Sequence, residues 1–301
     1  MGRLLGTAAP CIAPYSSSQA TIGQLAYTFG MPELPEVEEV RRTLEPHMLG
    51  LKVRAVEVRR KDFVTPSDSN LQTLAGHHVT RTLRHGKKLF LVADNDRTLV
   101  LHLGMSGRVD CVPSDAPVPK HTHVIFSLAN GTDVRLRDPR RFGGLGVYDT
   151  FTAAQLSESA NLGPDALVLT PADLAHWKTA RARIKQRLLA QTDVAGLGNI
   201  YVDEALWAAQ IHPQQRLDRL QPAQIDLLVK EILAVLNRSI RSGGTTLRDY
   251  RNVKDQPGQF ARQLKAYGRG GEPCLRCKTP LKSILISART TVFCPRCQRK
   301  R

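Results

Sequence analysis

The chain has 301 residues, of which 42% are hydrophobic, so it is long enough to bury the cores of two domains and is not a disordered polymer. Its 43 Lys and Arg against 27 Asp and Glu give a formal net charge of +16, which favours a polyanionic partner such as a nucleic acid. Six cysteines are few for a disulfide scaffold, and no apolar run reaches the roughly 18 residues of a membrane-spanning helix, so both classes are excluded.

Residues 1–30 contain no acidic residue, a single Arg and no apolar periodicity. A targeting leader would need more positive charge ahead of its apolar stretch, and an N-myristoylation signal would need Ser or Thr in place of Gly6. We therefore expect residues 1–30 to be a disordered or non-native leader, with translation starting at Met31.

Residues 31–40 read Met-Pro-Glu-Leu-Pro-Glu-Val-Glu-Glu-Val and predict the start of a helix. Pro35 suits the first helical position, because its missing N–H is not needed there. Acidic residues fill the first turn, which complements the helix dipole, and Val37, Val40 and Leu44 form an apolar face. Removal of Met31 would also turn Pro32 into a free secondary amine, which can attack carbon near neutral pH.

Residues 51–150 contain short runs in which apolar and polar residues alternate, and this period predicts β-strands. Asn130-Gly131 lies between two runs and is a strong hairpin signal, and residues 94–96 predict a looser turn. We expect an antiparallel β-sandwich whose strands include residues 52–58, 88–92, 98–103, 124–128 and 134–136.

Asn, Gly and Pro gather between residues 157 and 164, and the downstream periodicity is helical, which marks a domain boundary. Apolar residues at helical spacing predict one long helix that ends at Ser242-Gly243-Gly244: Ile225, Leu228, Val229, Ile232, Leu236 and Ile240. We expect a β-sandwich domain at residues 31–157, a helical domain at 164–262 and a cysteine-containing domain at 264–301.

Four of the six cysteines form two C-x-x-C pairs separated by sixteen residues: Cys274, Cys277, Cys294 and Cys297. This spacing is typical of a four-cysteine zinc site on a β-hairpin. Because four protein ligands leave no open position on the ion, we expect one structural Zn²⁺ rather than a catalytic metal.

The string Met-Pro-Glu-Leu-Pro-Glu-Val-Glu resembles the opening signature of bacterial formamidopyrimidine-DNA glycosylases, and the resemblance extends from residue 31 to about 298. It implies an α+β multidomain protein with an N-terminal helix and antiparallel β-sandwich, a helix-two-turns-helix domain and a C-terminal zinc-finger β-hairpin. It also implies a DNA repair enzyme that removes oxidised purines through an imine with its N-terminal proline and then cuts the strand by β,δ-elimination.

The resemblance assigns the catalytic residues. Pro32 is the expected nucleophile, and Glu33 is the expected proton donor that opens the sugar ring. The family places a lysine beside the lesion and its phosphates; Lys87 is preferred here over Lys88. Arg289, on the hairpin between the cysteine pairs, matches the arginine that inserts toward the lesion and binds backbone phosphate.

Further residues are expected to bind DNA. By resemblance Met105 fills the hole left by the damaged nucleotide, Arg140 reaches the orphaned cytosine, and Phe142 wedges between bases. Such a set recovers part of the few kcal/mol that unstacking a base costs. Met105 as core filler, and Arg140 with Phe142 as a basic surface, are the alternatives.

The glycine-rich turn Gly196-Leu197-Gly198-Asn199 leads into a predicted helix, so its backbone N–H groups can point at an anion. By resemblance Asn199 contacts DNA phosphate and Lys185 lies near the scissile phosphate. Glu204 and Glu36 are carried over as further DNA-site residues. The alternatives are a solvated helix position for Glu204, an ordinary solvated Lys185 and a helix-stabilising role for Glu36.

The implied partner is double-stranded DNA containing oxidised bases, bound by a monomer in the bacterial cytoplasm. Two rivals remain. An endonuclease VIII-like enzyme for oxidised pyrimidines would share the fold, although its opening has Gly where this chain has Leu34. A non-catalytic damage-binding protein would result if the leader stays attached, because Pro32 would then be an amide without a nucleophilic lone pair.

Overall fold

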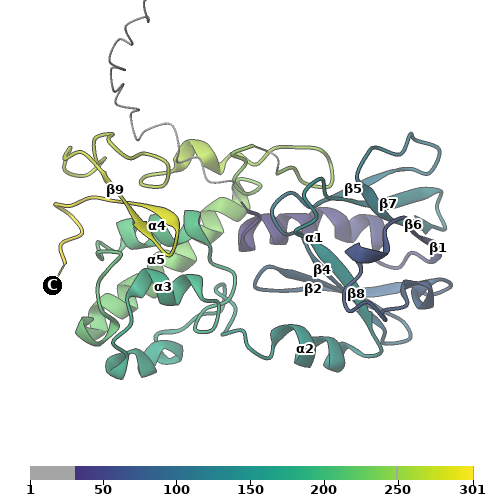
Figure 1. The fold of residues 1–301 in the computed structure, drawn as a ribbon, viewed down its shortest axis with the longest axis horizontal. Coiled ribbons are helices and arrows are strands. Elements are labelled where there is room, and N and C mark those ends of the chain that lie inside the picture. Colours follow the sequence, from purple (N-terminus) through teal and green to yellow (C-terminus); the bar gives the residue numbers. More distant parts are fainter. Residues whose placement is uncertain (1–30, 249, 301) are drawn as a thin grey trace, which may run out of the picture.

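The computed structural model describes residues 31–248 and 250–300. A β-rich half and a helical half lie side by side, and the C-terminal hairpin lies over the helical half (Figure 1). The α+β organisation predicted from the sequence is confirmed. The predicted leader at residues 1–30 lies outside the described residues.

The β-rich half is a sandwich of two four-stranded antiparallel sheets, with strand orders β1-β6-β7-β5 and β2-β3-β4-β8. The strands are β1 (Val53–Val58), β2 (Val79–His85), β3 (Lys88–Ala93), β4 (Thr98–His102), β5 (Arg108–Pro113), β6 (Thr122–Leu128), β7 (Thr132–Arg137) and β8 (Gly144–Tyr148). Apolar side chains from both sheets form one core.

The five predicted strand regions all contain strands, and the Asn130-Gly131 hairpin joins β6 to β7 as expected. Three strands were not predicted: β2, β5 and β8. Two glycines weaken the strand signal of β8, yet Gly146 is needed there, because a Cβ would lie 2.1 Å from the carbonyl oxygen of Thr65. Charged residues and a terminal proline likewise hide β5, which lies at the edge of its sheet.

Helix α1 (Leu34–Met48) joins the two halves. Val37, Val40 and Leu44 pack into the sandwich core, which confirms the predicted apolar face. Leu34, one turn earlier, packs instead into the core of the helical domain. The first turn of α1, next to Pro32, is therefore held by both domains.

The helical domain is built around α4 (Asn199–Ala208), all of whose residues are buried. Helix α5 (Pro222–Arg241) packs beside α4 and ends just before Ser242, as predicted, while α3 (Ile184–Leu189) contacts α4. Helix α2 (Phe151–Ser159) precedes the domain. Short 3₁₀ helices complete the fold: η2 (Lys61–Phe63), η3 (Leu71–Leu74), η4 (Pro171–Thr179), η5 (Leu217–Arg219) and η6 (Phe260–Gln263).

The C-terminal hairpin consists of β9 (Lys282–Ile286) and β10 (Arg289–Phe293), which pair antiparallel between the two cysteine pairs. Its buried residues pack with Trp207 and Ala208 at the end of α4. Among the described residues, no helix combines the length and the apolar character needed to cross a membrane.

Candidate active site and zinc centre

Pro32 is buried and lies immediately before Glu33, the N-cap residue of α1. The backbone N–H of Glu33 donates to Oε2 of Glu36 at 2.9 Å, which closes a capping box around the first turn. The capping box between Glu33 and Glu36 thus fixes the backbone that directly follows Pro32. Both glutamates belong to the same short sequence motif as Pro32.

The carboxylate of Glu33 lies at the N-terminus of α4. It accepts hydrogen bonds from the backbone N–H groups of Gly198 at 2.7 Å, Ile200 at 3.0 Å and Tyr201 at 3.4 Å. A Cβ at Gly198 would come within 2.4 Å of Cδ of Glu33, so glycine permits this close approach. The glycine-rich turn therefore binds a carboxyl group of the chain itself.

Lys87 interacts electrostatically with two other residues predicted to be catalytic, Glu33 and Arg289. Burial raises the pKa of Glu33, while the positive charge of Lys87 and the three backbone N–H groups oppose the rise. Burial lowers the pKa of Lys87; the charge of Glu33 works against this shift, and that of Arg289 adds to it. Lys88, the alternative lysine, instead forms an ion pair with Glu158.

Glu36 is 1% exposed and links three segments. Its Oε1 accepts hydrogen bonds from the hydroxyl of Tyr201 and from the backbone N–H of Thr245, the latter at 2.6 Å. Burial and the neighbouring charge of Glu33 raise the pKa of Glu36 to about 7. This placement matches the helix-stabilising alternative and does not support the predicted contact with DNA.

Lys185 is fully buried and pairs with Asp203 of α4 at 2.5 Å. The other oxygen of Asp203 accepts the backbone N–H of Val292 at 2.9 Å, so the pair ties α3 to the zinc hairpin through α4. A lysine in this position holds the domain together. Its placement supports neither the predicted phosphate contact nor the solvated alternative.

Asn199 and Glu204 also point inward. Nδ2 of Asn199 donates to the carbonyl oxygen of Thr290 at 2.9 Å, while its buried Oδ1 has no partner among the described residues. Glu204 is 2% exposed and accepts hydrogen bonds from the backbone N–H groups of residues 265–267 at 2.7 to 3.0 Å. Glu204 thus anchors the segment that leads to the zinc finger, and a contact with DNA is not supported.

The two loops predicted to fill the space of an extruded nucleotide lie against each other. A Cβ at Gly104, beside Met105, would lie 2.3 Å from the backbone nitrogen of Gly143. The Arg140 guanidinium lies 4.9 Å from the centre of the Phe142 ring, and that ring is 54% exposed. The loop that contains Met105 therefore packs against the loop that contains Arg140 and Phe142.

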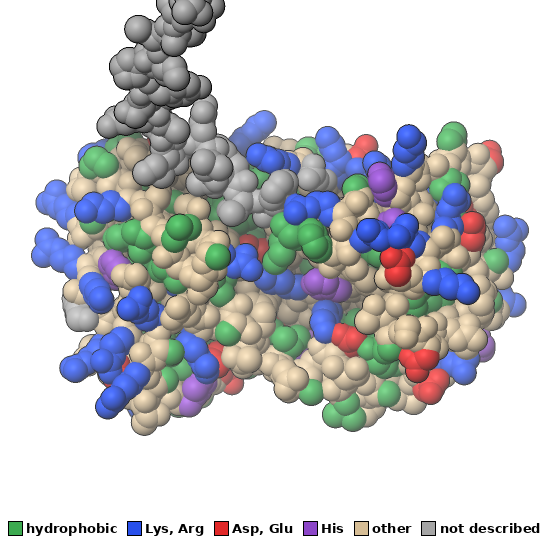
Figure 2. Space-filling model, viewed as in Figure 1, with side chains coloured by type: hydrophobic (Ala, Val, Ile, Leu, Met, Phe, Trp, Pro, Cys, Tyr) green, Lys and Arg blue, Asp and Glu red, His purple; other side chains and the backbone are tan. Residues whose placement is uncertain are grey.

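A pocket of about 360 Å³ opens beside these loops. It is lined mainly by arginines: Arg108, Arg137, Arg140, Arg248 and Arg251, together with Ser106 and Pro139. Lys and Arg side chains are also spread across the face of the molecule shown in Figure 2, where acidic side chains are fewer. This distribution suits a polyanionic ligand.

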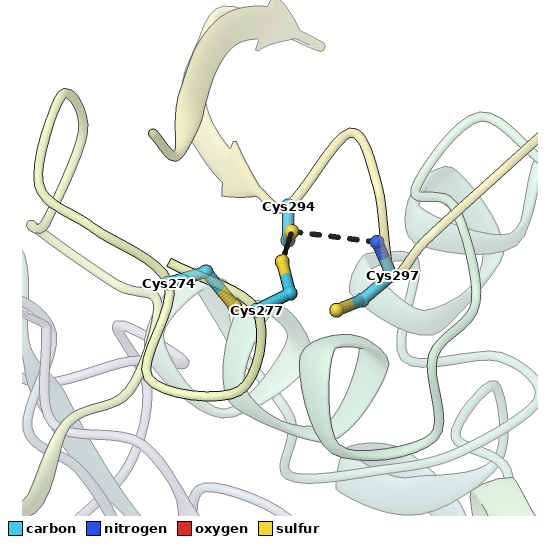
Figure 3. Close-up of side chains that lie close together, drawn as sticks. All are labelled: Cys274, Cys277, Cys294 and Cys297. Atoms are coloured by element: carbon cyan, nitrogen blue, oxygen red, sulfur yellow. Dashed lines mark hydrogen bonds between the residues drawn. The ribbon is translucent and has the colours of Figure 1, made fainter. Parts of the chain in front are cut away.

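The four predicted zinc ligands converge at the base of the hairpin (Figure 3). Their Sγ atoms all lie within 4.8 Å of one another, and those of Cys277 and Cys294 are 3.4 Å apart. Four thiolates about 2.3 Å from a tetrahedral ion lie about 3.8 Å apart, so the arrangement fits one structural zinc ion.

Arg276, within the first cysteine pair, attaches the zinc site to α4. Its guanidinium donates to the carbonyl oxygens of Trp207 at 2.7 Å and Ala208 at 2.8 Å, and it lies 4.1 Å from the centre of the Trp207 ring. A cation at the C-terminus of a helix also complements the helix dipole. The zinc hairpin is therefore docked on the helix whose other end holds Glu33.

Replacement of one zinc ligand is expected to unfold the hairpin while leaving the sandwich folded. In Cys277→Ser the ion loses one of four thiolates, and metal-binding energy is folding energy in a site of this kind. We expect about one zinc per wild-type chain by metal analysis, a lower content in Cys277→Ser and weaker DNA binding. Cys111→Ser, at a half-buried cysteine of β5, is the matched control. Equal DNA affinity in both variants would contradict a role for the hairpin in DNA binding.

Sequence reasoning missed several residues that organise the site. Arg84 and Asp165 form an ion pair beside Lys87, Tyr201 bonds to Glu36, and Asp203 neutralises Lys185. These partners lie between 18 and 165 residues apart in sequence. No local pattern marks such pairs, because each depends on how distant segments pack.

Comparison with known families covers most of the chain. Residues 31–145 match the formamidopyrimidine-DNA glycosylase N-terminal domain, residues 162–251 match the formamidopyrimidine-DNA glycosylase H2TH domain, and residues 271–299 match the zinc finger found in FPG and IleRS. The three matches follow the sandwich, the helical domain and the zinc hairpin in order.

Individual relatives give the same result. The formamidopyrimidine-DNA glycosylase of Latilactobacillus sakei is 40% identical over 90% of this chain and 99% of its own length, and that of Edwardsiella ictaluri is 42% identical over 89% of this chain and 100% of its own. A solved complex of Lactococcus lactis Fpg with DNA containing an abasic site has a TM-score of 0.83 at 34% identity and covers 89% of this chain and 100% of that one. The chain belongs to the formamidopyrimidine-DNA glycosylase family of base-excision repair enzymes.

Proposed function

We propose that this chain is a bifunctional DNA glycosylase and AP lyase that removes 8-oxoguanine and formamidopyrimidines from duplex DNA. The observation that carries the proposal is the buried Pro32 directly before Glu33, whose buried carboxyl group interacts electrostatically with Lys87. Solved structures of the Lactococcus lactis relative contain DNA with an abasic site or with N7-benzyl-Fapy-dG, which supports this substrate class.

In the proposed reaction the nitrogen of Pro32 bonds to C1′ of the damaged nucleotide as the bond between C1′ and the base breaks, and the base leaves with a proton. Glu33 donates a proton to the ring oxygen, which opens the sugar and leaves an imine at C1′. Loss of a proton from C2′ then expels the 3′ phosphate, and a second elimination expels the 5′ phosphate. Lys87 and Arg289 provide positive charge for these phosphates.

For DNA recognition we propose that Met105, Arg140 and Phe142 enter the helix when the damaged nucleotide leaves it. Their two loops pack together, and the exposed Phe142 ring is available to contact bases. Glu36, Lys185, Asn199 and Glu204 act by fixing the elements that carry the site, because their side chains are buried. The protein acts as a monomer in the bacterial cytoplasm, where cysteines remain reduced and able to hold zinc.

The test is incubation of a chain that begins at Pro32 with duplex DNA containing 8-oxoguanine opposite cytosine. We expect release of the free base and a one-nucleotide gap that ends in phosphate on both sides, since both eliminations occur. A matched duplex with an oxidised pyrimidine should be processed more slowly. Faster release of the pyrimidine would favour the endonuclease VIII-like alternative, and binding without base release would favour a damage-binding protein.

A further inference from the structure

The turn between β2 and β3 carries Lys87 and is held by Asp165, which lies near the start of the helical domain. We propose that Asp165, together with Arg84, is a positioning residue that fixes Lys87 opposite Pro32 and Glu33. The inference rests on the proposed function of Lys87 in catalysis and extends it to a residue of the helical domain.

The ion pair between Arg84 and Asp165 is bidentate and mostly buried. Both terminal nitrogens of the guanidinium donate to the carboxylate, one of them to Oδ1 at 3.0 Å. The side chains are only 6% and 14% exposed. Nε of Arg84 donates in addition to Glu38 of α1 at 3.1 Å, so one guanidinium joins the first helix, the turn and the start of the helical domain. Planar pairs of this kind restrict orientation as well as distance.

Gly86, the residue directly before Lys87, is held on both sides of its backbone by this pair. Its N–H donates to Oδ2 of Asp165 at 2.8 Å, and its carbonyl oxygen accepts a hydrogen bond from Nη1 of Arg84 at 3.0 Å. Gly86 has a φ of +57°, a conformation that glycine adopts without a steric penalty. The direction in which the chain enters Lys87 therefore depends on Asp165 and Arg84.

The same turn packs on the segment that holds the start of α1. A Cβ at Gly86 would lie 3.1 Å from Cβ of Ala195 and 3.3 Å from the backbone nitrogen of Gly196. The carbonyl oxygen of Gly196 in turn accepts the N–H of Leu34 at 3.0 Å. A displacement of the turn would thus change the position of Lys87 relative to Pro32, two residues before Leu34.

The ammonium group of Lys87 has no hydrogen bond or ion pair of its own among residues 31–248 and 250–300, although it lies in the electrostatic field of Glu33. Its location is consequently set by its backbone and by packing. The backbone restraint that Asp165 and Arg84 supply at Gly86 therefore contributes directly to the position of the lysine.

The test compares Asp165→Asn with Asp133→Asn in a chain that begins at Pro32. Asp133 is a buried partner of Arg135 in β7, so the same substitution removes a comparable ion pair away from the turn that carries Lys87. We expect Asp165→Asn to lower the single-turnover rate of 8-oxoguanine excision by about 10-fold or more at saturating enzyme, with little change in affinity for undamaged duplex, because small displacements of a catalytic group are costly. Asp133→Asn should keep the wild-type rate once folded.

A double-mutant cycle with Lys87→Ala shows whether Asp165 acts through the lysine. The expected result is that Asp165→Asn reduces the rate little further when Lys87 is already absent, since the two residues act as a unit. Full additivity, or a wild-type rate in Asp165→Asn, would overturn the inference. A wild-type rate in Lys87→Ala would instead show that Lys87 has no role in catalysis. The proposed function would be unaffected in that case, because the unaltered chain would still excise 8-oxoguanine. If Asp165→Asn folds poorly, Arg84→Lys, which keeps the charge but not the planar fork, provides the same comparison.

Discussion

A chain that begins at Pro32 is expected to become covalently trapped on duplex DNA containing 8-oxoguanine when borohydride is added, whereas the 301-residue chain is not. Imine formation needs a secondary amine with a free lone pair, and any residue ahead of Pro32 converts that nitrogen into an amide. We expect a large difference in trapping between the two chains, because an amide nitrogen has no lone pair available for attack on carbon. The measurement is the fraction of protein shifted to a DNA adduct on a denaturing gel.

Two variants and a mass measurement control this experiment. Pro32→Gly in the short chain keeps a free amine and should retain weak trapping, while Pro35→Ala changes the other proline of the same motif and should trap like the wild type. The mass of each preparation shows whether the leader and Met31 are present. Equal trapping of an intact 301-residue chain would mean that Pro32 is not the nucleophile, and Lys87 would then be the first internal amine to examine.

Elements with a local signal could be predicted from the sequence. The spacing of four cysteines predicts the zinc site without knowledge of the fold, since the two cysteine pairs directly flank one hairpin. The alternating runs predict five of eight sandwich strands, and the Asn130-Gly131 turn sets a hairpin.

Buried polar contacts between distant segments could not be predicted. Glu36, Lys185 and Glu204 carry charges that, in the sequence, resemble surface groups able to meet DNA. In the structure each meets partners from another part of the chain, and burial of a charge is tolerated because those partners are in place. The residue type alone cannot distinguish a charge that faces DNA from one that holds the protein together.

The glycine-rich turn illustrates the same limit at the active site. Its sequence predicts backbone N–H groups available to an anion, and that property is present. The group bound there is the carboxyl group of Glu33, which lies 165 residues from Gly198. The local sequence does not indicate that Glu33 is the bound group. This contact connects the helical domain to the residue that we propose as the proton donor.

Replacement of Glu33 by Gln is expected to lower the rate of 8-oxoguanine release by about 10²- to 10⁴-fold, the usual contribution of a positioned proton donor. Gln keeps an oxygen that can accept N–H groups of α4 but has no acidic proton. Strand cleavage at a preformed abasic site should fall much less, because its sugar already opens without enzyme and the Pro32 amine is unchanged. The measurement is the single-turnover rate on the two substrates.

The pH dependence gives a second check on Glu33. Burial raises the pKa of Glu33 in the folded protein, so the proton needed for donation is retained to higher pH than in an exposed glutamate. The rate of base release should therefore be highest below the raised pKa of Glu33 and should decline as the pH rises through that pKa. The Glu33→Gln variant should not show this decline. Glu57→Gln, at an exposed glutamate of β1, should behave as wild type. If Glu33→Gln kept the same declining limb, another group would have to donate the proton, and the buried carboxylate at the start of α4 would serve only to join the two domains.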